Sequence, residues 1–153
     1  MSSRPATCAA IKGGSAMVID LKLTDYLEMV RHARAIAPIE DCGLLGGRIE
    51  GDVKKVEKVF YLTNTDQSAE HFSLAPKEQF AAVKELREQG LVLLGNWHSH
   101  PVSPSRPSEE DKRLAFDTQA SYFILSLNGG EPVLNSFQVS RDKVVTKEDL
   151  RIR

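Results

Sequence analysis

A nearly continuous apolar run at residues 91–97 (LVLLGNW) limits the folds open to this chain more than any other feature. A strand with one wet face alternates apolar and polar residues, whereas a strand buried on both faces is apolar almost throughout. A second run of this kind follows at residues 122–127 (YFILSL). Two doubly buried strands predict a sheet whose two faces are both covered by other elements.

Three helices are predicted from apolar residues in steps of three and four and from residues that favour helix ends. The first has Thr24 as its N-cap and stops at Pro38. The second begins at Pro76 and ends at Gly90, and the third spans residues 108–117. The side chains expected to face the core on the first two helices are Leu23, Leu27, Val30, Ala33 and Ala37, then Phe80, Val83 and Leu86.

Further strands are predicted from alternating or continuous apolar segments at residues 17–23, 39–48, 53–62, 133–140 and 143–146. A turn signal, Glu-Gly-Asp, joins the second and third of these into a hairpin. Strands and helices therefore alternate along most of the chain. This order predicts an α/β sandwich, with a mixed sheet flanked by helices.

Composition and charge describe one globular domain and argue against several classes of function. The chain has 153 residues, of which 41% are hydrophobic and 27% are charged. A formal net charge of −1 supports binding neither to nucleic acid nor to an anionic membrane. No apolar run approaches the ~20 residues of a membrane span, so we expect a soluble, cytoplasmic protein. Residues 1–16 lack the apolar stretch of a signal peptide and are interpreted as a mobile arm before a domain at residues 17–153.

The chemically informative segment is His98-x-His100, which follows directly on the buried strand at residues 91–97. Side chains alternate along a strand, so the two imidazoles point to the same face of the sheet. Two imidazoles on one face at a strand end can bind a single metal ion. The strand also fixes their directions better than a loop would.

A third ligand and a base can come from other parts of the chain. Asp111 lies one turn into the helix that Ser108 begins, and a proline-rich loop can fold this turn back over the strand end. Two histidines and one carboxylate leave the fourth position open, as in a catalytic zinc site. Hydrolysis also needs a general base, for which Glu40, before a glycine-rich strand, is the best-placed candidate.

This combination resembles the motif of JAMM (MPN+) metalloproteases. The pattern His98-x-His100, seven residues, Ser108-x-x-Asp111 matches that motif without a gap. The segment at residues 40–46 (EDCGLLG) is similar to the one that carries the family's catalytic glutamate. The resemblance covers most of the chain from Met17 onward and implies a single-domain MPN (cytidine-deaminase-like) sandwich.

The resemblance also implies a role for each site residue. His98, His100 and Asp111 would bind one Zn²⁺ per chain. Glu40 would take a proton from the zinc-bound water and pass it to the leaving amine. Ser108 would donate a hydrogen bond to the oxyanion of the tetrahedral intermediate, a contribution of roughly 3–4 kcal/mol when such a donor is well aimed.

The substrate class follows from the same resemblance. Family members hydrolyse peptide or isopeptide bonds after the C-terminal Gly-Gly of ubiquitin or ubiquitin-like proteins. The short connection between Asp117 and Tyr122 has no room for the second insertion of the eukaryotic deubiquitinating members. The chain therefore looks like the short prokaryotic form, which implies a ubiquitin-fold sulfur carrier with a Gly-Gly tail as its partner. We expect a groove that binds this extended tail by strand addition.

Other interpretations of these residues stay open. The histidines can be ordinary strand-end residues, and Ser108 with Asp111 is also typical of a capping box. The chain can be a catalytically silent MPN scaffold that binds a protein partner. A cupin-type metal site is discounted, because Val92, Pro104 and Ser105 occupy the positions where that motif has glycine and glutamate.

Weaker expectations attach to other polar and aromatic residues. Cys42 is interpreted as a small buried residue and not as a nucleophile, because no basic partner adjoins it. Trp97 is expected in the core and Ser99 facing away from the metal. His32 is expected on a solvated helix face, and an approach of His71 to the cleft is left open.

Overall fold

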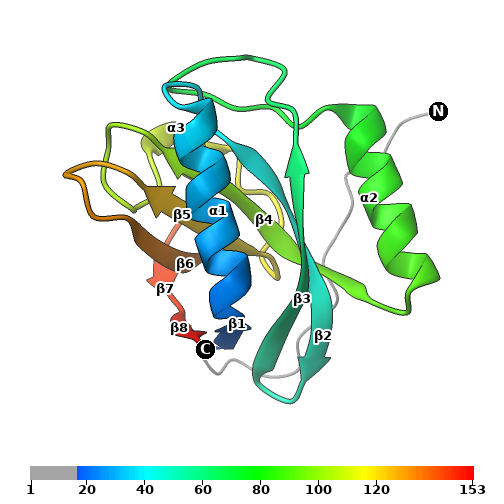
Figure 1. Ribbon diagram of the computed structural model, residues 1–153. Helices are drawn as coiled ribbons and strands as arrows, with labels where there is room; N and C mark the ends of the chain where they lie inside the picture. The colour runs from blue at the N-terminus through cyan, green and yellow to red at the C-terminus, as the bar shows by residue number, and fades with distance from the viewer. Residues whose placement is uncertain (1–16) are drawn as a thin grey trace.

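The computed structural model describes residues 17–153, which form one sheet with helices packed against it (Figure 1). The predicted arm at residues 1–16 lies outside the described residues. In the described part, no helix combines the length and the apolar character needed to cross a membrane. The elements in chain order are β1 (Val18–Leu21), α1 (Leu23–Ile36), β2 (Cys42–Glu50), β3 (Val53–Leu62), α2 (Pro76–Glu88), β4 (Val92–His100), α3 (Glu109–Arg113), β5 (Ser121–Ser126), β6 (Val133–Val139), β7 (Val145–Lys147) and β8 (Asp149–Ile152).

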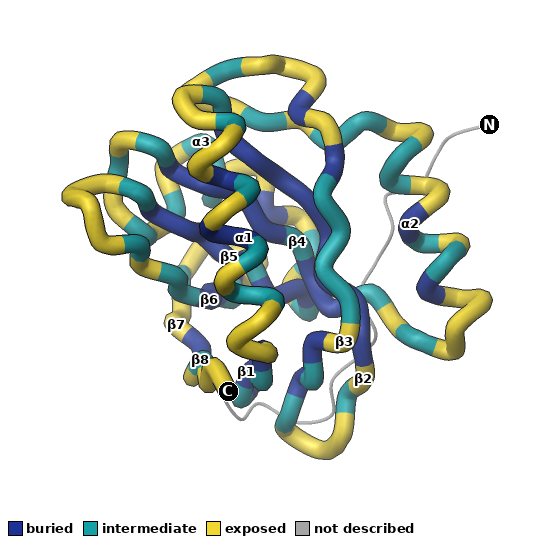
Figure 2. The backbone as a smooth tube through the Cα atoms, viewed as in Figure 1, coloured by how far each residue is buried: buried dark blue, intermediate teal, exposed yellow. Residues whose placement is uncertain are grey.

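The sheet is mixed, with strand order β7-β6-β5-β4-β2-β3-β1-β8. Its interior strand β4 runs antiparallel to β2 and parallel to β5. The two runs predicted to be doubly buried are thus interior strands, and Figure 2 shows buried backbone along both of them. The predicted mixed α/β architecture is confirmed.

Helices cover both faces of this sheet. Leu44 and Leu45 are consecutive in β2 and point to opposite faces, as strand alternation requires. Leu45 joins Ala33 of α1 and Trp97 in the larger apolar cluster. Leu44 joins Ala82 of α2 in a smaller one. The sheet is therefore sandwiched, with α1 on one face and α2 on the other.

Glycines in β2 allow neighbouring elements to approach its backbone closely. The Nε1 of Trp97 donates to the carbonyl oxygen of Phe60 at 3.0 Å, beside Gly43. A Cβ at Gly43 would lie 1.7 Å from that oxygen, so any other residue would collide with it. A Cβ at Gly46 would lie 2.1 Å from a terminal carbon of Leu86 in α2. The glycine-rich sequence thus sets how tightly α2 and β3 pack around β2.

The predicted buried faces of the helices need correction. Leu23 and Leu27 are wrong as core residues, because they are 48% and 55% exposed. The buried residues of α1 are Met29, Val30 and Ala33. The true and the predicted stripes share two positions, so periodicity alone cannot decide between them, and packing against the sheet does.

In α2 the predicted core residue Phe80 is wrong, and the small side chain of Ala82 faces the sheet instead. Phe80 is 74% exposed, whereas Ala82 and Leu86 are buried. The start of α1 also differs from the prediction: its N-cap is Lys22, without a side-chain cap bond, and Thr24 lies inside the first turn.

The third helix, Glu109–Arg113, is much shorter than the predicted span of residues 108–117, and a turn replaces its predicted end. The hydroxyl of Tyr122 donates to the carbonyl oxygen of Asp117 at 3.1 Å and accepts from its N–H at 3.2 Å. The carboxylate of Asp117 accepts from the N–H of Gln119 at 2.9 Å. These bonds hold a turn directly before β5, where the sequence pattern predicted the end of a helix.

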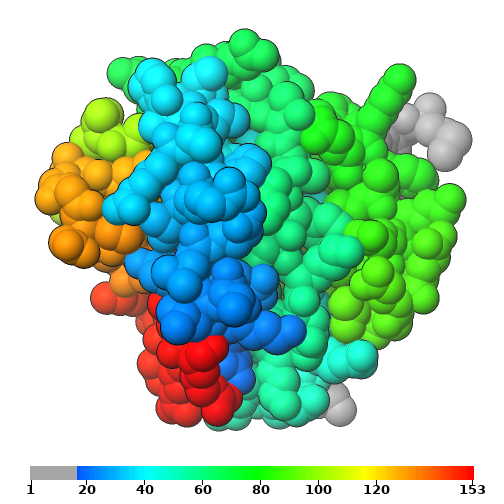
Figure 3. All heavy atoms as spheres, in the orientation of Figure 1, coloured from blue at the N-terminus to red at the C-terminus, as the bar shows by residue number. Residues whose placement is uncertain are grey.

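The last strand, β8, was not predicted, and it changes the shape of the sheet. Although β7 and β8 lie at opposite edges, only Glu148 separates them in the chain. The N–H of Glu148 donates to Ser136 O in β6 at 2.8 Å, and the Ser136 hydroxyl donates to the Glu148 carboxylate at 2.7 Å. The sheet therefore curls until its edges meet. In Figure 3 the C-terminal residues lie against the start of α1.

Candidate metal centre

A register shift in β4 determines which face its histidines occupy. The pairing with β2 slips by one residue at Leu94, which leaves that residue as a bulge. Both Leu94 and Trp97 therefore lie in the core cluster under α1. By alternation His98 and His100 point to the opposite face, and both are buried.

A capping box places the carboxylate of Asp111 over the end of β4. The Ser108 Oγ accepts from the N–H of Asp111 at 3.0 Å, and Asp111 Oδ2 accepts from the N–H of Ser108 at 2.9 Å. The capping interpretation is thus confirmed, and it leaves the hydroxyl hydrogen of Ser108 free to be donated elsewhere.

Three ligand atoms converge at this point. The Nε2 atoms of His98 and His100 lie 3.0 Å apart, and Asp111 Oδ2 lies 3.1 Å from the first and 3.2 Å from the second. In a tetrahedral zinc site with bonds of about 2.0–2.1 Å, ligand atoms lie about 3.3 Å apart. Two imidazole nitrogens and one carboxylate oxygen at this spacing fit a zinc ion and leave a fourth position open.

The orientations of the two rings are set by different neighbours. The Nδ1 of His100 donates to the carbonyl oxygen of Pro104 at 2.8 Å, which leaves Nε2 with a lone pair for a metal. The ring of His98 stacks on Phe72, with centroids 4.4 Å apart and planes 20° apart. Within residues 17–153 no group accepts a hydrogen bond from His98 Nδ1. Ring stacking therefore holds His98 where a hydrogen bond holds His100.

The pKa shifts of His98 and Asp111 favour the protonation states that bind a cation. Burial lowers the pKa of His98 and keeps its imidazole neutral. Burial acts against a charged His100 too, but its hydrogen bond with Asp111 raises its pKa. Burial alone would raise the pKa of Asp111, but the two imidazoles hold it well below its usual range. The Asp111 carboxylate is therefore ionised, as a metal ligand requires.

Glu40, two residues before β2, interacts with the same site. It is only 4% exposed, with its N–H donating to Ser68 O at 2.9 Å and its carbonyl accepting from Asn64 Nδ2 at 3.0 Å. Burial raises the pKa of Glu40 to about 8, with a smaller lowering by His100 and a raising by Asp111. Its side chain thus interacts electrostatically with two of the three candidate ligands, His100 and Asp111.

The loop between β3 and α2, which Figure 1 shows running from the end of β3 to the start of α2, contributes to the site. Phe72 of this loop stacks on His98. The Nδ1 of His71 contacts the Glu110 carboxylate on α3. This contact links the loop to the helix that carries the candidate third ligand. Sequence patterns alone did not identify either contact.

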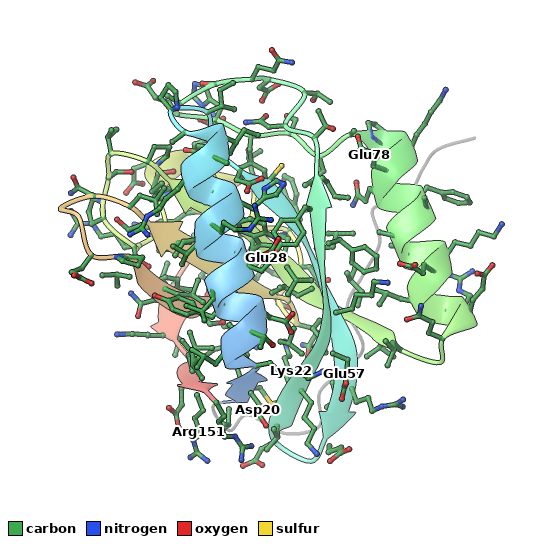
Figure 4. The ribbon with its side chains drawn as sticks, viewed as in Figure 1. Asp20, Lys22, Glu28, Glu57, Glu78 and Arg151 are labelled. Atoms are coloured by element: carbon green, nitrogen blue, oxygen red, sulfur yellow. The ribbon has the colours of Figure 1, made fainter. Side chains whose placement is uncertain are left out.

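Hydrogen bonds at both ends hold this loop in place. The Oδ1 of Asn64 accepts from the N–H groups of Asp66 and Ser73 at 3.0 and 3.1 Å. The N–H and hydroxyl of Thr63 donate to Glu78 at 3.0 and 3.1 Å. Figure 4 shows Glu78 at the start of α2, next to the loop.

A second network lies behind the site, on the α1 face. Asp41 accepts from Cys42 N–H at 3.0 Å and contacts His32 Nδ1 at 2.5 Å, and its own N–H donates to Ser99 Oγ at 2.7 Å. The expectation of a solvated His32 is therefore wrong, because its ring also packs on Tyr61 with centroids 4.5 Å apart. Cys42 is buried as predicted, and burial raises the pKa of its thiol to about 12.

Comparison with known proteins gives consistent results. The family model that describes prokaryotic homologs of the JAB domain matches residues 24–140. The CysO-cysteine peptidase of Mycobacterium tuberculosis is 27% identical over 143 residues, which cover 93% of this chain and 96% of that protein. A probable TtuB-protein conjugate cleaving protease of Thermus thermophilus is 40% identical over 99 residues, covering 64% of this chain and 63% of that one. A solution structure of a Desulfitobacterium hafniense protein has a TM-score of 0.81 and 51% identity, covering 88% of this chain and 92% of that one.

Proposed function

Because the chain belongs to the prokaryotic JAB family, we propose that it is a zinc-dependent peptidase or isopeptidase of JAMM type. Its substrate would be a ubiquitin-like or sulfur-carrier protein, cut after a C-terminal Gly-Gly. The names of two relatives, a CysO-cysteine peptidase and a TtuB-protein conjugate cleaving protease, support this substrate class. The cytidine-deaminase-like form of the sandwich belongs to the same proposal.

The observation that carries this proposal is the convergence of three ligand atoms beside a buried glutamate. The Nε2 atoms of His98 and His100 and the Oδ2 of Asp111 lie 3.0 to 3.2 Å from one another. A bound zinc ion would supply a Lewis acid for the scissile carbonyl and would acidify the attacking water. These three residues would hold that ion.

Glu40 would move the protons. Its buried carboxyl has a raised pKa, which suits a group that must both accept and release a proton near neutral pH. It would take a proton from the attacking water and deliver it to the nitrogen of the leaving amine. The hydrolysis consumes one water, breaks the C–N bond and yields a carboxylate end and an amine.

Ser108 would stabilise the charge that develops on the carbonyl oxygen. Its Oγ is used as an acceptor by the N–H of Asp111, so its own hydrogen is available. The capping box fixes the serine beside the ligand set, which supports a donor aimed in advance at the oxyanion.

A cleavage assay tests the proposal. Candidate ubiquitin-fold carriers with extensions after Gly-Gly are incubated with the wild-type protein and the Glu40→Gln variant and weighed by intact mass spectrometry. We expect the wild type to remove the extension and the variant to be about 100-fold slower or more, at unchanged zinc content. A variant as fast as the wild type would exclude Glu40 as the base.

The same assay separates an enzyme from a silent scaffold. A wild-type protein that contains no zinc and cleaves no carrier, but still binds one, would overturn the enzymatic proposal and favour the scaffold. Zinc analysis and a binding measurement on the same samples distinguish this result from a wrong choice of carrier.

A further inference from the structure

A small pocket opens next to the candidate metal ligands, over strands β4, β5 and β6. Its lining includes His98 and Asp111, so a group that enters the pocket lies directly beside the proposed site of reaction. Phe72 from the β3–α2 loop and Leu114 from the end of α3 form its walls. Leu114 is 49% exposed and therefore forms the rim.

The floor of the pocket is one face of three adjacent strands. Asn96 of β4 pairs with Tyr122 of β5, and His98 pairs with Ile124, so these side chains share a face. Val139 of β6 completes the floor. The floor is as rigid as the sheet itself, because all of these residues lie in interior strands.

The lining is almost entirely uncharged. Asp111, which faces the metal position, is the one acidic side chain of the lining, and no lysine or arginine takes part. The Oδ1 of Asn96 is buried and has no hydrogen-bond partner among the described residues. The pocket thus offers mainly apolar contact. A charged side chain there would lose its hydration, and the one lining carboxylate, Asp111, would already be engaged by the metal.

We propose that this pocket receives the side chain of the residue that follows the scissile bond and selects an uncharged, largely apolar one. This inference rests on the proposed function, in which the residue before the bond is glycine. Glycine has no side chain to fill the pocket, so the leaving residue must fill it. Cysteine fits the class well, because its side chain is small and largely apolar.

The test uses one ubiquitin-fold carrier in four forms that differ only in the residue after Gly-Gly: Val, Cys, Asp or Lys. Wild-type kcat/KM is measured for each by mass spectrometry. We expect Val and Cys to be cleaved about 10-fold faster or more than Asp and Lys. Equal rates for all four would overturn the inference.

A charge change at the rim sharpens the test. Leu114→Lys should raise the rate for Asp relative to Val about 10-fold, because it gives the aspartate a partner. Leu114→Ala, which adds no charge, should keep the wild-type order and serves as the matched control. If Leu114→Lys also keeps the wild-type order, the pocket does not hold the leaving residue.

A binding measurement separates failure of this inference from failure of the proposed function. The affinity of the Glu40→Gln variant for the four carriers is measured by calorimetry, which needs no turnover. If the wild type cleaves none of them but the variant binds Val above Asp, the hydrolytic function fails and the pocket assignment stands. If the carriers are cleaved, but neither the rates nor the affinities depend on the residue after Gly-Gly, the pocket assignment fails while the hydrolytic function stands.

Discussion

Glu40 and Asp41 are consecutive acids directly before β2, and their side chains have different surroundings. Asp41 meets His32 and the N–H of Cys42, whereas Glu40 interacts electrostatically with His100. The pKa of Asp41 is raised, chiefly by burial, and the hydrogen bond with His32 opposes that rise. His32 therefore helps Asp41 to stay charged in a buried position.

Removing His32 should destabilise the protein, because a buried charge on Asp41 is then left with less compensation. His32→Ala leaves the buried carboxylate of Asp41 with fewer partners and should lower the free energy of unfolding by about 1–3 kcal/mol. The folded-state pKa of Asp41 then rises further above the unfolded value of 3.8, so the folded state binds protons more readily than the unfolded state. The deficit should be smallest below pH 3.8 and grow as the pH rises. Urea unfolding at several pH values measures it.

Asp41→Asn provides the control for this pair. In a double-mutant cycle the two changes should couple by about 1 kcal/mol or more, because each removes the same contact. Fully additive effects would mean that the contact contributes nothing to stability.

The residues of the candidate site were predictable to different degrees. His98, His100, Ser108 and Asp111 are close in sequence, and strand alternation with a capping box fixes their relative positions. The stacking of Phe72 on His98 was not predictable, because the path of its loop depends on hydrogen bonds to residues far away in the chain.

Among the elements, β2 shows how a short sequence sets the packing of its neighbours. Gly43→Ala would force a Cβ to within 1.7 Å of the carbonyl oxygen of Phe60 and should lower the free energy of unfolding by about 3 kcal/mol. Gly90→Ala is the comparison, since its Cβ would meet nothing within 4 Å but its φ is +70°. Backbone strain there should cost only about 1–2 kcal/mol. Thermal or urea unfolding ranks the two, and equal losses would contradict the close-approach explanation.

Strands were predicted better than helix faces, for a physical reason. The doubly buried runs of β4 and β5 are apolar whichever neighbour covers them. The helices α1 and α2 have apolar residues on more than one side, and the sheet selects one: Met29 is buried while Leu27 is exposed. The strand β8 (DLRI) was missed because it is short, charged and mostly exposed.

At the scale of the whole molecule, the curl of the sheet brings its edges together at Glu148. Ser136→Ala would remove the hydroxyl that donates to this buried carboxylate and should lower the free energy of unfolding by about 1–3 kcal/mol. In a Glu148→Gln background the same change should cost less, because the charge that needs the donor is gone. A loss that is the same in both backgrounds would show that this contact does not hold the edges together. Chemical denaturation of the four proteins measures it.

The candidate site lies where distant segments meet. The residues before β2, the end of β4, the first turn of α3 and the β3–α2 loop all contribute to it. The loop is tied to α3 by the contact of His71 with Glu110. The motif spacing pointed to the first three of these segments. The contribution of the loop depends on the complete fold, and a local pattern does not contain it.

Zinc binding tests the proposed centre most directly. Protein loaded with one equivalent of zinc is dialysed, its metal content is measured by mass spectrometry, and its affinity is measured against a competing chelator. We expect one zinc per wild-type chain and an affinity about 100-fold or more weaker in Asp111→Ala. Glu109→Ala, with a side chain 93% exposed in the same helical turn, should bind zinc like the wild type. A wild-type chain that retains no zinc, or an Asp111→Ala variant with unchanged affinity, would contradict a zinc centre at these residues.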